Sequence, residues 1–444
     1  MTINQSMQLA VQHHRAGRFA EAEVICHQVL AQVPDHVDAL HLLGVLAGQA
    51  GHPDDAIHLI GHAIGLKPSA EAHSNLGVAL REKGRLDEAI DAHRLALALK
   101  PDYADAWRNL GVALNAKGLF DEAMSAFERA VEIKPDFADV HFNLGVLRLL
   151  RGDFQNGWPE YEWRWKLQSQ LTSRPQGPGQ WDGSELGGQT ILLYGEQGIG
   201  DTLQFIRYVP LVVARGGRVI VECPRELASL FEAFAGIERV VVTGEPRPRF
   251  DQHCALLSLP RVFSTQIDSI PAEIPYVKAD PRLVEQWQRR SGPKQDVRVG
   301  LAWAGRPTHR NDRYRSIAFS ELAPLWSQKG IEFYSLQKGP AAQQRPPDGT
   351  RWVDWTDDLH DFAQTAALIE NLDLVITVDT SVAHLAGAMG KPVWVLLPFV
   401  PDWRWLLNRE DSPWYPTARL FRQNAISDWQ GVINSVVGRL HKRV

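Results

Sequence analysis

The first third of the chain repeats one pattern of apolar, small and proline positions. Three kinds of position recur in register: Leu-Gly pairs beginning at Leu43, Leu76, Leu110 and Leu144, prolines at Pro34, Pro68, Pro101 and Pro135, and glycines at Gly51, Gly84, Gly118 and Gly152. All three series step by 33 or 34 residues, the period of a helix–turn–helix repeat. Small residues let paired helices approach closely and proline ends each unit, so the pattern predicts an α solenoid over residues 1–167.

The two ends of this array depart from the regular pattern in different ways. An earlier unit fits at residues 3–33, with Gly17 and Ala22 in the matching places. The unit from Pro135 loses its pattern in its second half, where Trp158 and two further tryptophans stand. A terminal repeat must cap the stack or dock onto another part of the protein, and we expect one of these roles here.

The array resembles the tetratricopeptide repeat, which implies a concave surface that binds extended peptides or proteins. A spacer or dimerisation arm is the alternative. Asn75, Asn109 and Asn143 occupy matching places in successive repeats and are candidates for the concave face. Their side-chain amides can donate and accept, so they can hold a peptide backbone. Hydrogen bonding within the repeats is the alternative for these residues.

After residue 167 the periodicity changes. Residues 168–189 are rich in Gly, Pro and polar residues and are predicted to be a linker. Beyond them, short β-branched apolar runs alternate with segments of helical period, which predicts parallel sheets. We expect two Rossmann-like halves, 190–291 and 292–444, facing each other across a cleft. A helix is expected over Thr202–Arg215, kinked at Pro210.

The most informative of these segments is Leu374 to Pro398. Leu374–Val378 and Val393–Leu397 have strand character, and a short helix between them makes a βαβ unit. The polar residues after the first strand are Asp379, Thr380, Ser381 and His384. Ligands of open α/β sheets bind at the carboxyl ends of strands, and helix N-termini bind anions, so these residues are expected to line one pocket. Helix capping beside a hydrogen-bonded histidine is the alternative.

A glycine-rich turn follows the first predicted strand of the α/β region. Gly198 and Gly200 offer backbone N–H groups to a phosphate or another anion at a helix start. The third glycine of a dinucleotide-binding motif is absent, because Leu203 takes its place, so an NAD-dependent enzyme is a minor alternative. Asp201 is either a helix-capping residue or a carboxylate that accepts a proton from an acceptor hydroxyl.

Three other segments end strands on the same predicted edge. The basic run Arg306 to Arg315 is suited to neutralising a diphosphate, with a solvated loop as the alternative. Gln337 can hydrogen-bond a base or a ribose. The aromatic loop around Asp402–Trp405 either stacks on sugars and bases or packs itself onto a domain.

Composition narrows the class of protein. A chain of 444 residues exceeds a single core, and a formal charge of −5 argues against a nucleic-acid-binding protein. We find no apolar run of about 18 residues and no signal peptide. Three widely spaced cysteines fit a reducing cytoplasm. Because no metal-binding motif is present, we expect no metal and no cofactor.

Residues 190–440 resemble the heptosyltransferase-like glycosyltransferases, which have the two-Rossmann (GT-B) fold. The resemblance rests on GIGD ending at Asp201 and on VDTSVAHLAGAMGKP at Val378–Pro392. It implies that Asp201 is the base and that Asp379, Thr380, Ser381 and His384 form the nucleotide-diphosphate loop. Arg315 stands where the family usually has a basic residue. Gln337 lies near a ribose-binding position that is usually acidic, so the nucleotide stays open.

Joining repeats to this fold also resembles the protein O-linked N-acetylglucosamine transferases. The chemistry implied is an inverting, metal-independent displacement at the anomeric carbon. The sequence therefore predicts a cytoplasmic glycosyltransferase that uses a nucleotide sugar and acts on a protein or peptide held by the repeats. It is expected to bind no nucleic acid and to have no membrane span. The alternative is a repeat scaffold whose transferase fold has lost its chemistry.

Overall fold

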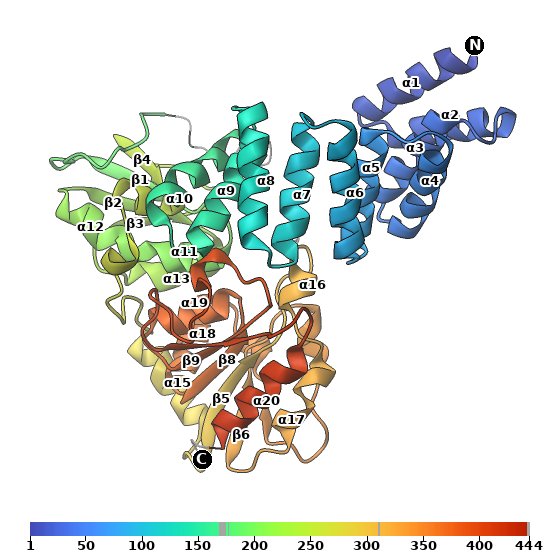
Figure 1. Ribbon diagram of the computed structural model, residues 1–444. Helices are drawn as coiled ribbons and strands as arrows, with labels where there is room; N and C mark the ends of the chain where they lie inside the picture. Colours follow the sequence, from blue (N-terminus) through green and yellow to red (C-terminus); the bar gives the residue numbers. More distant parts are fainter. Residues whose placement is uncertain (168–174, 176, 310, 442–444) are drawn as a thin grey trace. The chain divides into compact units, whose positions relative to one another are not determined.

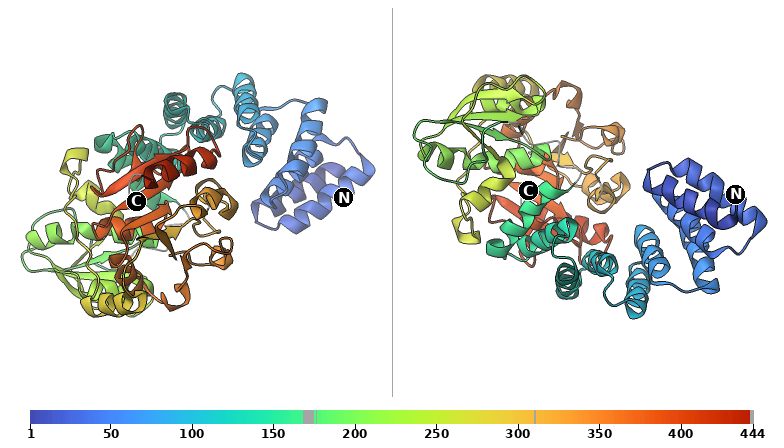
Figure 2. Two further views of the ribbon diagram at one scale, coloured as in Figure 1. Left: turned by 90° about the horizontal axis from the view of Figure 1, so that it is seen from below. Right: turned by 90° about the horizontal axis from the view of Figure 1, so that it is seen from above.

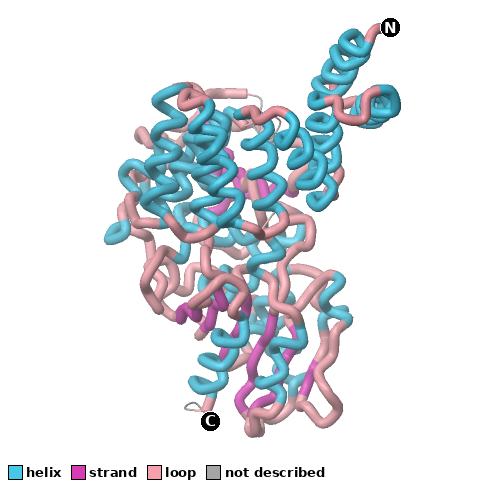
Figure 3. The backbone as a smooth tube through the Cα atoms, turned by 45° about the vertical axis from the view of Figure 1, so that its right-hand side comes forward, coloured by secondary structure: helices cyan, strands magenta, loops and turns pink. Residues whose placement is uncertain are grey.

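The computed structural model describes residues 1–167, 175, 177–309 and 311–441 (Figure 1). The chain forms two compact units, Met1–Leu147 and Arg148–Val444. The first contains helices alone, whereas the second combines strands with helices (Figure 3). The α solenoid followed by an α/β region is therefore confirmed. Within the described residues, no helix is both long and apolar enough to span a bilayer.

The first unit is a row of antiparallel helix pairs (Figures 1 and 2). Its helices are α1 (Ile3–Arg15), α2 (Phe19–Gln32), α3 (Val37–Gln49), α4 (Pro53–Leu66), α5 (Ala70–Glu82), α6 (Leu86–Leu99), α7 (Ala104–Ala116), α8 (Phe120–Ile133) and the start of α9 (Ala138–Leu150). The expected early unit is present as α1 and α2. The predicted repeats are thus confirmed.

In three of the four Leu-Gly pairs, the glycine allows the two helices of a repeat to touch. A Cβ on Gly44 would lie 2.6 Å from the Ile60 side chain, and one on Gly111 would lie 2.6 Å from Phe127. In the repeat between them, a Cβ on Gly77 would lie 2.5 Å from the ring of His93. Any larger residue would force these helices apart, which explains the periodic glycine.

The N-terminal half of the α/β region has a four-stranded parallel sheet of order β3-β2-β1-β4. Its strands are β1 (Thr190–Tyr194), β2 (Arg218–Cys223), β3 (Ile237–Val242) and β4 (Gln252–Ala255), and its helices are α11 (Ile199–Phe205), α12 (Val209–Ala214), α13 (Arg225–Glu232) and α14 (Leu259–Val262). The helix expected over Thr202–Arg215 is not continuous. A 3₁₀ turn at Ile206–Tyr208 interrupts it, and Pro210 lies at the start of α12, where its missing N–H is harmless.

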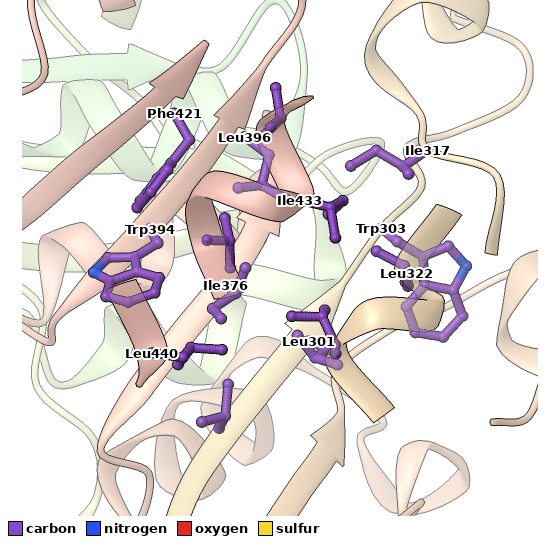
Figure 4. Close-up of a cluster of buried hydrophobic side chains, with 14 of the residues drawn as sticks. Leu301, Trp303, Ile317, Leu322, Ile376, Trp394, Leu396, Phe421, Ile433 and Leu440 are labelled. Carbon is purple, nitrogen blue, oxygen red and sulfur yellow. The ribbon is translucent and has the colours of Figure 1, made fainter. Parts of the chain in front are cut away.

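The C-terminal half has a six-stranded parallel sheet of order β10-β9-β8-β5-β6-β7. Its strands are β5 (Val297–Ala302), β6 (Ile331–Ser335), β7 (Trp352–Val353), β8 (Leu374–Val378), β9 (Val393–Leu397) and β10 (Ala418–Arg422), and its helices are α15 (Pro281–Ser291), α16 (Asp312–Arg315), α17 (Ala323–Trp326), α18 (Phe362–Glu370), α19 (Ser381–Ala388) and α20 (Trp429–Leu440). Side chains from β5, β8, β9 and α20 form its core (Figure 4).

The tryptophan-rich end of the last repeat belongs to the second unit. Its helix α10 (Phe154–Tyr161) continues into the 3₁₀ helix η1 (Glu162–Lys166). The Trp158 indole N–H donates to the carbonyl of Thr265 at 2.8 Å. The compact units therefore divide at Leu147, before the boundary at 167 that the sequence suggested. Of the two roles expected for this segment, the structure favours docking onto the α/β region.

Most of the described part of the predicted linker also packs on the N-terminal half. Residues 168–174 and 176 of the linker lie outside the described residues. Trp181 is buried, and its backbone N–H donates to the carbonyl of His253 in β4 at 2.8 Å. This stretch extends the sheet region rather than separating it from the repeats.

Candidate functional site

The two α/β halves meet where α11 packs against α19. The approach is tight at Gly200, where a Cβ would lie 2.7 Å from Cδ2 of His384 and 3.6 Å from Cα of Ser381. Gly198 and Asp201 lie on the same turn, and Asp379 and Thr380 directly precede α19. Most of the residues that the sequence predicted for the site are thus brought together here.

Both carboxylate oxygens of Asp201 accept hydrogen bonds from the protein. Oδ2 accepts from the backbone N–H of Gly198 at 2.7 Å, and Oδ1 accepts from Nη2 of Arg404. The side chain is 18% exposed. Capping and ion pairing therefore coexist, and each oxygen keeps a further lone pair for another donor.

The bond from Gly198 changes the interpretation of the glycine turn. Its N–H was expected to bind an external anion, but the chain's own Asp201 carboxylate already accepts from it. Gly200 has a packing role, because its missing side chain makes room for His384. The expectation of an anion site on this turn is therefore not supported by the geometry.

Arg404 lies in the aromatic loop that the sequence singled out, but its contact with Asp201 was not predicted. It lies in the loop after β9, and its side chain is 7% exposed. Nη1 donates to Asp402 at 2.8 Å, and Nε donates to the Gln204 side chain at 2.6 Å. Burial opposes the charge of Arg404, but the carboxylates of Asp402 and Asp201 outweigh it and raise the pKa. Its partner Asp201 is 203 residues away, so no local pattern could have indicated the pair.

The start of α19 has the features of an anion site. Thr380 is its N-cap with extended backbone, yet none of the described side chains accepts from the first N–H groups. The Thr380 hydroxyl instead lies 3.1 Å from the hydroxyl of Thr377. Arg315 donates to the backbone carbonyl of Asp379 at 3.2 Å, so a guanidinium group adjoins this helix end. Free N–H groups and a cation together favour an anionic ligand.

Two titratable side chains beside this helix end have strongly shifted pKa values. Burial, reinforced by the charge of Asp402, raises the pKa of Asp379 to about 7, against the opposing effect of Arg315. Burial and the charge of Arg404 lower the pKa of His384 well below its usual value. At neutral pH, His384 is therefore an uncharged imidazole.

The His384 ring is held rigidly. Nδ1 lies 2.8 Å from the hydroxyl of Tyr415, and the ring stacks on Trp405 with centroids 5.6 Å apart and planes at 21°. Nε2 lies 3.9 Å from Oδ1 of Asp379. The neutral ring thus lies near both Gly200 of α11 and the Asp379 carboxylate.

Gln337 has a different role from the predicted one. It is buried, and Oε1 accepts from the N–H groups of Trp303 and Ala304, both at 2.9 Å. Nε2 donates to the carbonyls of Ala304 at 3.0 Å and Lys338 at 2.8 Å. The amide is used by backbone groups at the end of β5, so we correct the predicted ribose contact to a structural one.

The aromatic loop after β9 packs inward. Trp403, Trp405, Trp414 and Tyr415 are all nearly inaccessible to solvent. Of the two expected roles, packing the loop onto the domain is the one that the structure supports. From the basic run, Arg315 reaches the site, and Arg310 lies outside the described residues.

Two of the three candidate asparagines, Asn75 and Asn109, take part in hydrogen bonds between neighbouring repeats. Nδ2 of Asn75 lies 2.9 Å from Nε2 of His41, and Nδ2 of Asn109 donates to the Ser74 hydroxyl at 3.1 Å. Asn143 is half-buried. One donor of two of these amides is therefore already engaged in stacking the repeats. Their contact with a peptide stays a prediction.

A second buried cluster, which the sequence did not indicate, joins the glycine turn to η1 and consists of Arg164, Glu196 and Ser258. Arg164 of η1 donates to Glu196 at 2.9 Å and to the Ser258 hydroxyl at 2.8 Å. Burial raises the pKa of Glu196 to about 7 although Arg164 opposes the shift. Among the described residues, no group of His, Cys, Asp and Glu side chains is arranged to hold a metal ion.

Models of known protein families match segments in both the repeats and the α/β region. Tetratricopeptide repeat models match residues 13–76 and 68–136. The model of glycosyltransferase family 9 (heptosyltransferase) matches residues 312–396. This last segment contains Arg315, Asp379 and His384 but not Asp201.

Among relatives, Protein FlbA from Caulobacter vibrioides is 27% identical over 97% of this chain and 82% of FlbA. Protein O-mannosyl-transferase TMTC1 from Mus musculus is 31% identical over 96 residues, 20% of this chain and 10% of TMTC1. The chain therefore spans about a tenth of TMTC1.

Solved structures with local likeness include a crystal structure of MamA, 28% identical, covering 37% of this chain and 97% of that one with a TM-score of 0.32. TTC0263 from Thermus thermophilus is 20% identical. The alignment covers 37% of this chain and 91% of TTC0263, with a TM-score of 0.34. The sequence models and the observed elements together show that this chain carries tetratricopeptide repeats followed by a glycosyltransferase family 9 domain.

Proposed function

We propose that the chain transfers a sugar from a nucleotide-diphosphate sugar to a hydroxyl group of a protein or peptide. The family 9 match supports a glycosyltransferase. The donor class, the acceptor and the chemistry that follow are inferences from the site. A cytoplasmic location belongs to the same proposal, because three unpaired thiols suit a reducing compartment.

The observation that carries the proposal is the pairing of an anion site with a carboxylate on opposite halves. On the C-terminal half, the first N–H groups of α19 and the guanidinium of Arg315 suit a diphosphate. On the N-terminal half, Asp201 lies one residue from the point where α11 touches α19. A donor held at α19 would therefore have a general base close to its anomeric carbon.

The chemistry follows from these positions. The oxygen of the acceptor hydroxyl bonds to the anomeric carbon while Asp201 accepts the proton of that hydroxyl. The bond from the anomeric carbon to the diphosphate oxygen breaks at the same time. The negative charge that develops on the diphosphate is stabilised by Arg315 and the α19 N-terminus. A single displacement of this kind inverts the anomeric configuration. The chain's own cations supply the charge stabilisation, so the proposal includes no metal and no cofactor.

A protein or peptide acceptor follows from the repeats. Tetratricopeptide arrays present an extended surface to which a polypeptide can bind. The relative TMTC1 is named a protein O-mannosyl-transferase, although it matches only 20% of this chain. We infer that the first unit selects the acceptor while the α/β unit performs the transfer.

The test is sugar transfer by the purified chain and two variants. Asp201→Asn and Asp379→Asn are each expected to lower turnover by at least about 100-fold. Asp428→Asn is the matched control, because Asp428 caps α20 through the N–H of Gly431 at 2.9 Å, far from the donor loop in sequence. Unchanged turnover in both site variants would refute the assignment.

A scaffold without chemistry remains the second candidate, because one observation favours it. The chain's own donors occupy both oxygens of Asp201. A scaffold predicts that nucleoside diphosphates raise the unfolding temperature with increasing concentration while no transfer occurs with any acceptor tested. Transfer that depends on Asp201 excludes this candidate.

A further inference from the structure

The loop Asp402–Trp405 leaves the C-terminal half and packs among segments of the N-terminal half. Trp403 stacks on Phe205 of α11, with ring centroids 6.3 Å apart and planes at 25°. Its other neighbours include Trp158 of α10, at 5.3 Å and 88°. Because this indole is buried on all these sides, the backbone of the following residue, Arg404, is fixed relative to α11.

The side chain of Arg404 contacts α11 at two places. Nη2 binds the carboxylate of Asp201, and Nε donates to Oε1 of Gln204 at 2.6 Å. These two residues are three apart and so lie on one face of the helix. A planar guanidinium group with two such partners fixes the orientation of the Asp201 carboxylate as well as its position.

We propose that Arg404 is a positioning residue for the reaction, orienting the Asp201 carboxylate from the donor-binding half. The inference rests on the proposed function. It adds that the base is complete only while the two halves are in contact, because the base and the group that orients it come from different halves. A donor that draws the halves together would thereby assemble its own base.

The charges around Asp201 explain why a single arginine matters. Tyr161 of α10, Glu196 of the glycine turn and His309 of the loop before α16 also lie within electrostatic reach of Asp201. On the donor-binding half, Asp402 and Arg315 lie within electrostatic reach of Asp379. Arg404 is paired with both Asp201 and Asp402, so without it these two carboxylates would lose a shared guanidinium group.

The test measures kcat and KM for the full chain and three arginine variants. Arg404→Ala is expected to lower kcat on the order of 100-fold, with little change in KM for the donor. Arg404→Lys, which keeps the charge but lacks the planar group with its two partners, is expected to recover part of the lost kcat. Arg409→Ala is the control, because it removes a pair with the exposed Asp411 and is expected to leave kcat and KM unchanged.

Chemical rescue separates orientation from mere packing. Added guanidinium ion, at concentrations below those that unfold the protein, is expected to raise the kcat of Arg404→Ala at least about tenfold, because it replaces the missing charged group. It is expected to restore none in the double variant with Asp201→Asn. Little change in kcat for Arg404→Ala, or no rescue by guanidinium ion, overturns the inference while leaving the proposed function intact.

A measurement independent of activity completes the test. The unfolding midpoints of Asp201→Asn, Arg404→Gln and the double variant form a cycle, and the inference expects the double variant to lose less than the sum of the two single losses. Additive losses overturn the inference. If the wild-type chain transfers no sugar, the proposed function fails, and the inference that depends on it fails as well.

Discussion

The contact between α11 and α19 makes a strong prediction for Gly200→Ala. The new Cβ would lie 2.7 Å from Cδ2 of His384, whereas ordinary contacts begin at 3.4 Å, so the two must separate by about 0.7 Å (3.4 minus 2.7). His384 cannot rotate away, because Tyr415 and Trp405 hold its ring. The strain therefore passes to the helices, and the Asp201 carboxylate moves with α11.

The magnitude follows from two opposing terms. Overpacking a core contact costs about 1–3 kcal/mol. Replacing a helical glycine by alanine contributes up to about 1 kcal/mol of stability. We therefore expect Gly200→Ala to be destabilising by roughly 0–3 kcal/mol, and its turnover to fall on the order of 100-fold as Asp201, the proposed base, is displaced.

The matched control is Gly438→Ala in α20. No described atom outside its own helix and chain neighbours lies within 4 Å of a Cβ built there. This variant is expected to be stabilised by roughly 0.5–1 kcal/mol. Thermal unfolding of both variants, followed by circular dichroism, and sugar transfer are the assays. If Gly200→Ala matches Gly438→Ala in stability and the wild type in turnover, the described contact is wrong.

Three further predictions concern the core of each unit. His93 occupies the position that an apolar residue, Ile60 or Phe127, fills in the neighbouring repeats, and neither of its ring nitrogens has a hydrogen-bond partner among the described residues. His93→Phe is therefore expected to stabilise the repeats by about 1–3 kcal/mol, and Phe127→His to destabilise them. Hydrogen exchange of α5 to α8 measures both effects. Burial raises the pKa of Glu196 from 4.5 to about 7, so the folded state binds this proton more tightly and stability is lost as the pH rises from about 4.5 to 7. In a plot of the unfolding midpoint against pH, Glu196→Gln should reduce the fall in stability between about pH 4.5 and 7. The pKa of Asp379 is also raised to about 7, so the fall due to Asp379 should remain. An unchanged plot contradicts the burial of Glu196. Gln337→Glu places a carboxylate against two carbonyls and should be destabilising by about 3 kcal/mol, whereas a ribose contact would predict a change in donor preference at constant stability.

The sequence was sufficient for features that depend on local periodicity. The step of 33 or 34 residues indicated the repeats because each helix pair must present small residues to its partner, as Gly44 does to Ile60. The run from Leu374 to Val378 indicated a buried strand, and the polar residues after it correctly indicated the start of α19. These inferences need only neighbours within one element.

The sequence was insufficient where a side chain's partner lies far along the chain. Nothing near Arg404 indicates that it binds Asp201, and nothing near Arg164 indicates Glu196 in the glycine turn. Gln337 was assigned to a ligand because it ends a strand, but the backbone of Trp303 uses it instead. Strand ends collect both ligands and structural polar groups, and only tertiary contacts distinguish them.

The central claim is that this chain attaches a sugar to protein, with Asp201 as the base. The most direct measurement is intact-mass spectrometry of proteins from cells that contain the wild-type chain or its Asp201→Asn variant at equal levels. The account predicts that at least one protein gains the mass of a sugar with the wild-type chain and lacks it with the variant. Identical masses in the two samples would contradict the account.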